Sequence, residues 1–254
     1  MTNNNGLDPF WFASRALAVR SVSLGGLYLT NLIIVRHGHT ALNNGDRFRG
    51  ITDTPLSERG RREAKLTAGA IEARWKVKAV YTSSVPRARE TAQAIADPFG
   101  LRPVDESGIL DMDYGDWTGL AFEEAQARDP EAYRTCFERS SAFRAPRGES
   151  FEELRERSVT AVKAIAERHE GQDVVIVTHT VIIRLILLGF LDMSTDFFWR
   201  IRQGTCAINV IERDKGQYYL GMINDTCHTD ELAKVHGKET SAATRGLPLT
   251  TTAS

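Results

Sequence analysis

The chain of 254 residues has little cysteine, no excess of either charge and no long apolar run, and each shortage excludes a class of protein. The formal net charge of −1 argues against a general nucleic-acid-binding or membrane-surface protein, because both usually show a basic excess. No uninterrupted apolar run is long enough to span a bilayer. The three cysteines are widely spaced and fit no metal-ligand pattern, so we expect no metal ion and a reducing, cytoplasmic location.

The most informative stretch is an apolar run over residues 32–35 that ends abruptly in Arg36, His37 and Gly38. The run predicts a buried strand, and ligands of open α/β sheets bind at the C-terminal ends of such strands. An arginine beside a histidine, followed by a glycine that lets backbone amides approach closely, suits a bound phosphoryl group. Neutral imidazole is also a competent nucleophile near pH 7. We therefore expect phosphate chemistry on His37, although the tripeptide alone would better fit a core strand that ends in solvent, and three other stretches decide against that reading.

A second stretch combines a predicted strand over residues 78–82 with a serine pair, Ser83 and Ser84, either of which could cap a helix. Pro86 fits the first helical position, and the helix is expected to run to about residue 96. Arg87 then falls in the first turn, where the helix dipole disfavours a cation. This placement indicates an anion shared by Arg87 and the free amides of the turn.

A third stretch, residues 174–178, predicts another buried strand that ends in histidine, here His179. The following residues, 181–188, are apolar nearly all round and predict a buried helix. A lone histidine at a strand end is more often structural than catalytic. Two such strands running parallel, however, would place His37 and His179 on the same edge of the sheet.

A fourth stretch, residues 110–119, holds Asp111, Asp113 and Asp116 between glycines and aromatic residues, and predicts a loop. One of these carboxyl groups could supply the acid that phosphate chemistry needs. Spacing alone does not choose among them.

Together, these four motifs resemble the histidine phosphatase superfamily, also called phosphoglycerate mutase-like. The resemblance covers about residues 31 to 228. Further matches lie at Asn43, Gly50, residues 53–57, Gly60, residues 148–150 and residues 224–226. It implies an α/β three-layer sandwich with a mostly parallel central sheet, one antiparallel edge and helices on both faces. A hairpin signal over residues 207–211 and 217–223 fits that edge.

The resemblance also implies roles for the site residues. His37 would attack phosphorus and carry a phosphohistidine, while Arg36, Arg87 and His179 would hold the phosphoryl oxygens and offset the charge of the transition state. Asn43 would add a hydrogen bond to the phosphoryl group.

Aligning the acidic loop with the family places Asp111 at the proton donor, a position usually occupied by glutamate, with Asp113 and Asp116 as alternatives. Thr180 stands where glycine commonly follows the second histidine, so its side chain is expected to crowd or contact the substrate.

The acidic loop favours one activity of the family over another. It reads Asp-Met-Asp-Tyr-Gly, whereas mutases typically carry Glu-Arg-His-Tyr-Gly. The chain looks most like the broad-specificity and α-ribazole phosphatases, which implies a metal-independent phosphomonoesterase without a cofactor that acts on a small phosphorylated metabolite. A cofactor-dependent phosphoglycerate mutase is the alternative reading. A silent protein that binds a phosphorylated ligand comes third, because it would be expected to lack one of the four principal site residues.

Around this domain we expect an N-terminal extension over residues 1–30 that packs on the domain or in an oligomer such as a homodimer. Residues 229–254 are expected to form a disordered tail. A lid insertion is expected over about residues 120–148, in which one or two arginines, with Arg147, could read a second anionic group on the substrate. Ser57 and Ser150 are predicted to cap helices, the latter in a capping box with Glu153.

Overall fold

The computed structural model of the chain describes residues 29–44, 46–230 and 232. The predicted N-terminal extension and the predicted disordered tail lie almost entirely outside these described residues. Within the described part, no helix has both the length and the apolar character needed to cross a membrane.

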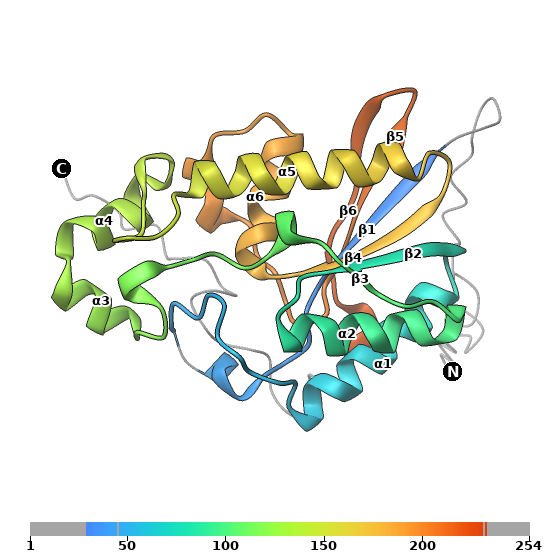
Figure 1. Cartoon of the computed structure of the whole chain (residues 1–254), viewed down its shortest axis with the longest axis horizontal. Helices are drawn as coiled ribbons and strands as arrows, with labels where there is room; N and C mark the ends of the chain where they lie inside the picture. Colours follow the sequence, from blue (N-terminus) through green and yellow to red (C-terminus); the bar gives the residue numbers. More distant parts are fainter. Residues whose placement is uncertain (1–28, 45, 231, 233–254) are drawn as a thin grey trace, which may run out of the picture.

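A six-stranded sheet forms the centre of the molecule (Figure 1). In spatial order its strands are β3 (Val104–Asp105), β2 (Val77–Thr82), β4 (Asp173–Thr178), β1 (Thr30–Arg36), β5 (Ile208–Asp214) and β6 (Gln217–Asp225). The first four run parallel, whereas β5 is antiparallel to both β1 and β6. The predicted mostly parallel sheet with an antiparallel edge is confirmed, as is the hairpin that forms this edge.

Strands β1 and β4 are neighbours in the middle of the sheet and end together. Their register pairs Arg36 with Thr178, and the backbone N–H of His37 donates to the carbonyl oxygen of Thr178 at 2.9 Å. The residue that follows each strand is one of the predicted histidines, His37 or His179. The expected convergence of the two histidines on one sheet edge is therefore confirmed.

Helices cover both faces of the sheet (Figure 1). One face carries α1 (Glu58–Glu72) and α2 (Pro86–Ala96), and the other carries α5 (Phe151–Arg168) and α6 (Thr180–Phe190). Helix α6 is buried over most of its surface, as its nearly continuous apolar sequence predicts. The structure is thus the three-layer sandwich that the sequence predicted.

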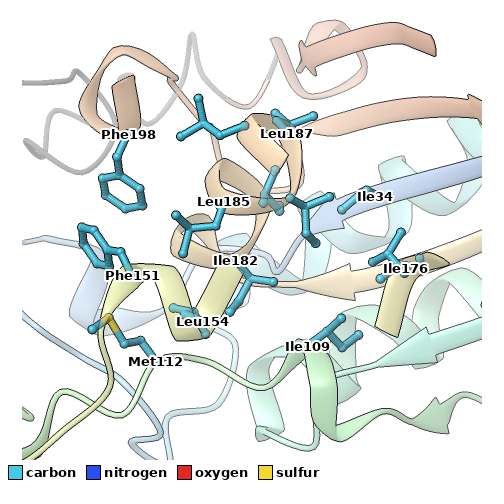
Figure 2. Close-up of a cluster of buried hydrophobic side chains, with 14 of the residues drawn as sticks. Ile34, Ile109, Met112, Phe151, Leu154, Ile176, Ile182, Leu185, Leu187 and Phe198 are labelled. Atoms are coloured by element: carbon cyan, nitrogen blue, oxygen red, sulfur yellow. The ribbon is translucent and has the colours of Figure 1, made fainter. Parts of the chain in front are cut away.

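Side chains alternate along β1 between the two faces. Ile33 and Val35 join the hydrophobic cluster beneath α1 and α2, whereas Leu32 and Ile34 join a larger cluster with α5 and α6. Figure 2 shows Ile34 and Ile176 of the sheet in this larger cluster. Burial on both faces fixes the strand positions and therefore the positions of the residues that follow the strands.

Two of the predicted helix caps are present, and a third is not. The Ser57 hydroxyl accepts from the backbone N–H of Gly60 at the start of α1, and Ser150 forms a capping box with Glu153 at the start of α5. Helix α2 begins at Pro86 as expected, but its N-cap is Val85, which makes no side-chain capping bond. The serine pair was therefore wrong as a cap, and the reason lies in the site described below.

The segment predicted as a lid contains α3 (Phe122–Arg128) and α4 (Pro130–Glu138), which lie at one end of the molecule in Figure 1. Aromatic rings pack this lid segment against the residues that follow α6. Phe137 stacks on Trp199 with ring centroids 4.5 Å apart, and Phe122 meets Phe137 edge to face at 5.5 Å.

Candidate active site

His37 lies just beyond the end of β1 and is only 5% exposed. Its Nδ1 lies 2.8 Å from the carbonyl oxygen of Gly38, so a proton on Nδ1 would be donated there and the lone pair of Nε2 would be left for chemistry. The backbone approaches closely at this point, because a Cβ on Gly38 would lie 2.7 Å from the carbonyl oxygen of Gly60. The local chain thus fixes both the ring and its tautomer.

His179 faces His37, with ring centroids 5.3 Å apart. Its Nε2 lies 2.8 Å from the hydroxyl of Ser83, which explains why this serine does not cap α2. Its buried Nδ1 makes no hydrogen bond among the described residues.

Both imidazoles are held neutral near pH 7. Burial lowers the pKa of His37 well below its usual value, and Arg87, His179 and Arg36 act in the same direction. Burial likewise lowers the pKa of His179, with Arg87 next in effect. A neutral His37 retains the lone pair that a nucleophile requires.

Arg87 and Asp111 form a buried ion pair in the pocket. The Arg87 NH2 group lies 2.7 Å from Asp111 Oδ2, and it also donates to the carbonyl oxygen of Gly50 at 2.7 Å. The Nε of Arg87 is buried without a hydrogen-bond partner among the described residues. His179 Nδ1 is 3.3 Å from the same carboxylate oxygen. Burial raises the pKa of Asp111, and the charge of Arg87 opposes that rise.

The structure separates Asp111 from the other two aspartates of its loop. Asp111 is buried and lines the pocket. The carboxylate of Asp113 accepts from the backbone N–H of Gly115, whereas that of Asp116 pairs with Arg147, and both side chains are exposed. Of the three candidates for the proton donor, Asp111 alone lines the pocket with His37 and His179.

A salt bridge outside the pocket holds this loop in place. Arg157 on α5 pairs with Glu149 through two contacts of 2.8 and 3.0 Å and donates to the carbonyl oxygens of Gly108 and Asp111. Glu149 in turn accepts from the backbone N–H of Asp113 at 2.9 Å. We call this pair the loop clamp. It connects the C-terminal end of the lid to the backbone that carries Asp111.

Arg36 and Asn43 are buried but do not line the pocket. Arg36 donates to the carbonyl oxygen of Gln203 at 2.7 Å, and Gln203 exchanges side-chain hydrogen bonds with Asn209 on β5. The side-chain oxygen of Asn43 accepts from the backbone N–H and the hydroxyl of Thr40. The positive charge of Arg36 still acts on both histidines.

The other predicted residues line a pocket with about 550 Å³ of empty space, part of it open to solvent. The lining consists of His37, Arg47, Phe48, Arg49, Gly50, Arg87, Asp111, Tyr114, Phe122, His179, Thr180, Val181, Arg184, Phe198 and Trp199. Thr180 therefore lies in the pocket wall. The lid arginines and Arg147 are not in this lining, and Arg144 pairs with Glu153 instead.

Sequence reasoning missed the cations that do reach the pocket. Arg47 and Arg49 lie on the loop before Gly50, and Arg184 lies on the buried helix α6. The sequence offered one signal for Arg184, because it is a charged residue within an otherwise apolar helix. No group of three or more histidine, cysteine or acidic side chains in the described residues could hold a metal ion.

This arrangement suits phosphoryl transfer. A neutral imidazole is placed beside cations that stabilise a phosphoryl group, and a buried carboxyl group is placed where it can exchange a proton. The imidazole, the cations and the carboxyl group lie together where β1 and β4 end.

Comparison with known proteins gives a consistent result. The family model described as the histidine phosphatase superfamily, branch 1, matches residues 32–226. The chain is 31% identical to phosphoserine phosphatase 1 of Hydrogenobacter thermophilus over 80% of this chain and 96% of that protein. It is 32% identical to the metal-independent phosphoserine phosphatase of Arabidopsis thaliana over 80% of this chain and 85% of that protein.

A solved structure shares the fold. Bacillus stearothermophilus YhfR superposes with a TM-score of 0.74 at 32% identity, covering 78% of this chain and 98% of the other.

Proposed function

Because the chain belongs to the histidine phosphatase superfamily and is a phosphatase, we propose that it hydrolyses a small phosphomonoester without a metal ion, through a phosphohistidine on His37. The observation that carries this proposal is the meeting of His37, His179, Arg87 and Asp111 in one buried pocket. Phosphoserine is the first candidate substrate, since two relatives of similar length are named phosphoserine phosphatases.

In the first half of the reaction, the Nε2 lone pair of His37 attacks phosphorus and the ester P–O bond breaks. Arg87 and the N–H of His179 hold the equatorial oxygens, while Arg36 adds positive charge from behind the pocket wall. The leaving alkoxide takes a proton from Asp111, whose burial favours the protonated form.

In the second half, the ionised Asp111 accepts a proton from a water molecule as that water attacks the phosphohistidine. The P–N bond breaks, inorganic phosphate leaves, and His37 regains its lone pair. Asp111 is protonated again and ready for another ester. Each cycle therefore consumes one water and returns both residues to their starting states.

The proposal is tested by measuring phosphate release from a panel of phosphomonoesters with and without EDTA, alongside a mutase assay primed with bisphosphoglycerate. We expect EDTA-resistant release from at least one small ester. Release that EDTA abolishes would overturn the metal-independent mechanism. Mutase turnover without net phosphate release would instead assign the alternative activity.

A further inference from the structure

Ser83 is a buried neighbour of one of the two histidines in the pocket. It follows β2 and has no exposed surface, whereas His179 follows the adjacent parallel strand β4 and is 1% exposed. The backbone N–H of Ser83 donates to the carbonyl oxygen of Val177 at 3.1 Å, which fixes its position beside β4. Its hydroxyl lies 2.8 Å from His179 Nε2, and Ser83 does not line the pocket. Any effect of Ser83 on a substrate must therefore pass through His179.

The hydrogen bonds of this hydroxyl decide which nitrogen of His179 carries the ring proton. A neutral imidazole has one N–H, and a hydroxyl has one proton to donate. The backbone N–H of Val85 donates to the Ser83 oxygen at 3.4 Å, and His179 Nε2 is the one acceptor that the hydroxyl contacts among the described residues. A ring proton on Nε2 would leave the buried hydroxyl proton without an acceptor. The ring proton is therefore placed on Nδ1.

Nδ1 is the ring nitrogen of His179 that lies toward the charged groups of the pocket. It is 3.3 Å from Asp111 Oδ2, the same oxygen that accepts from Arg87 at 2.7 Å. A phosphoryl oxygen that takes the place of this carboxylate oxygen beside Arg87 would meet the N–H of His179 as well. A bare lone pair on Nδ1 would instead repel that oxygen.

Asp111 alone would not keep the proton on Nδ1. As the proposed proton donor, Asp111 changes its protonation state twice in each cycle, and a protonated carboxyl group can donate to a bare Nδ1. The hydroxyl of Ser83 keeps its proton throughout the cycle. The tautomer of His179 then stays the same while Asp111 gains and loses its proton.

We propose that Ser83 is a positioning residue that holds the ring proton of His179 on Nδ1, where it donates to a phosphoryl oxygen. The inference rests on the proposed function and adds to it a residue outside the pocket lining. Each histidine then has its tautomer fixed by a partner that does not line the pocket, which is the carbonyl oxygen of Gly38 for His37 and the hydroxyl of Ser83 for His179.

Nitrogen-15 NMR of the histidine side chains tests the tautomer, because protonated and bare ring nitrogens resonate in different ranges. The His179 signals are identified by their loss in His179→Gln protein. We expect the wild type at pH 7 to carry the proton on Nδ1, and Ser83→Ala to carry it on Nε2 in a detectable share of the molecules. Ser83→Thr, which keeps the hydroxyl, should retain the wild-type tautomer. A proton on Nε2 in the wild type would overturn the proposal, whether or not a variant folds.

Kinetics tests whether this tautomer serves the reaction. Ser83→Ala should lower kcat/KM by about 3- to 10-fold, the size expected for one lost hydrogen bond. The loss should be the same on alkyl phosphates and on nitrophenyl phosphate, because the N–H of His179 acts on the phosphoryl group and not on the leaving oxygen. Ser84→Ala is the matched control, since Ser84 is the adjacent serine and is exposed. Its tautomer and its kcat/KM should equal those of the wild type.

The proposal requires both changes in Ser83→Ala. A shifted tautomer with unchanged kcat/KM would overturn it, and so would a lowered kcat/KM with the wild-type tautomer, because Ser83 would then serve packing alone. A loss confined to alkyl phosphates would also overturn it, since Ser83 would then act through Asp111. If the wild type hydrolyses no ester, the proposed function fails instead, and the affinity for inorganic phosphate, measured by calorimetry, replaces kcat/KM in the comparison.

Discussion

Asp111 is subject to two opposing effects within the pocket. Burial raises the pKa of its carboxyl group, whereas the guanidinium of Arg87, 2.7 Å away, lowers it. A phosphoryl group that takes over Arg87 would weaken this second effect, because the cation would then be shared with the phosphate oxygens. The bound substrate would thus promote protonation of the residue that must donate the proton.

Replacement of Asp111 by asparagine tests this role. We expect Asp111→Asn to lower kcat/KM on alkyl phosphates by about 10²- to 10⁴-fold, because a poor leaving group needs the proton. The loss of kcat/KM on nitrophenyl phosphate should be much smaller, since nitrophenolate leaves without a proton, whereas kcat on this ester should fall because the water step lacks its base. Steady-state kinetics on both esters is the measurement. Equal losses of kcat/KM on the two esters would assign the role of proton donor to another residue.

At the scale of elements, the loop clamp determines where Asp111 lies. Glu149 and Arg157 hold both sides of the loop, and neither lines the pocket. The close fit leaves no room for side chains, because a Cβ on Gly115 would lie 2.2 Å from the carbonyl oxygen of Pro146. Movement of the lid end would therefore displace the proton donor.

We expect Glu149→Gln and Arg157→Met to lower kcat/KM on alkyl phosphates about 10-fold or more, since a displacement of about 1 Å can cost 10²-fold. The kcat/KM on nitrophenyl phosphate should be less affected, because its leaving group does not need the acid. Glu153→Gln is the matched control, since Glu153 pairs with Arg144 at the surface of the same helix and glutamine preserves the capping box. An equal loss of kcat/KM on both esters would indicate that the loop clamp supports the fold without positioning Asp111.

The elements also show what the sequence could predict. The strand ends at His37 and His179 were predictable because buried parallel strands end at one edge and the residues after them must meet. Spacing alone could not choose Asp111, since a loop has no periodicity that orients its side chains, and only the alignment with the family placed the acid there. The partner of Ser83 and the position of Arg184 depend on contacts with segments about 96 and 17 positions away in the chain, which local patterns do not encode.

At the scale of the whole molecule, the buried histidines make stability depend on pH. Burial lowers the pKa of His37 and His179 well below 6.5, so the unfolded chain binds protons below that pH that the folded protein does not. The free energy of unfolding should therefore fall as the pH decreases below about 6.5, by about 1.4 kcal/mol per pH unit for each histidine. Asp111, whose pKa is raised from 3.8, acts in the opposite direction at lower pH.

Urea unfolding over roughly pH 5.5 to 7.5 measures this effect. His37→Gln should reduce the slope of stability against pH by about one proton. An unchanged slope in that variant would show that His37 titrates alike in the folded and unfolded states.

The central claim is the phosphohistidine on His37, and trapping it is the most direct test. Asp111→Asn protein mixed with nitrophenyl phosphate should accumulate the intermediate, because the leaving group needs no acid while the attacking water lacks its base. After an alkaline quench and digestion, mass spectrometry should find one added phosphoryl group on the peptide that contains His37, and none in the double variant with His37→Ala. A phosphoryl group on another residue, or sustained turnover by His37→Ala, would contradict the account.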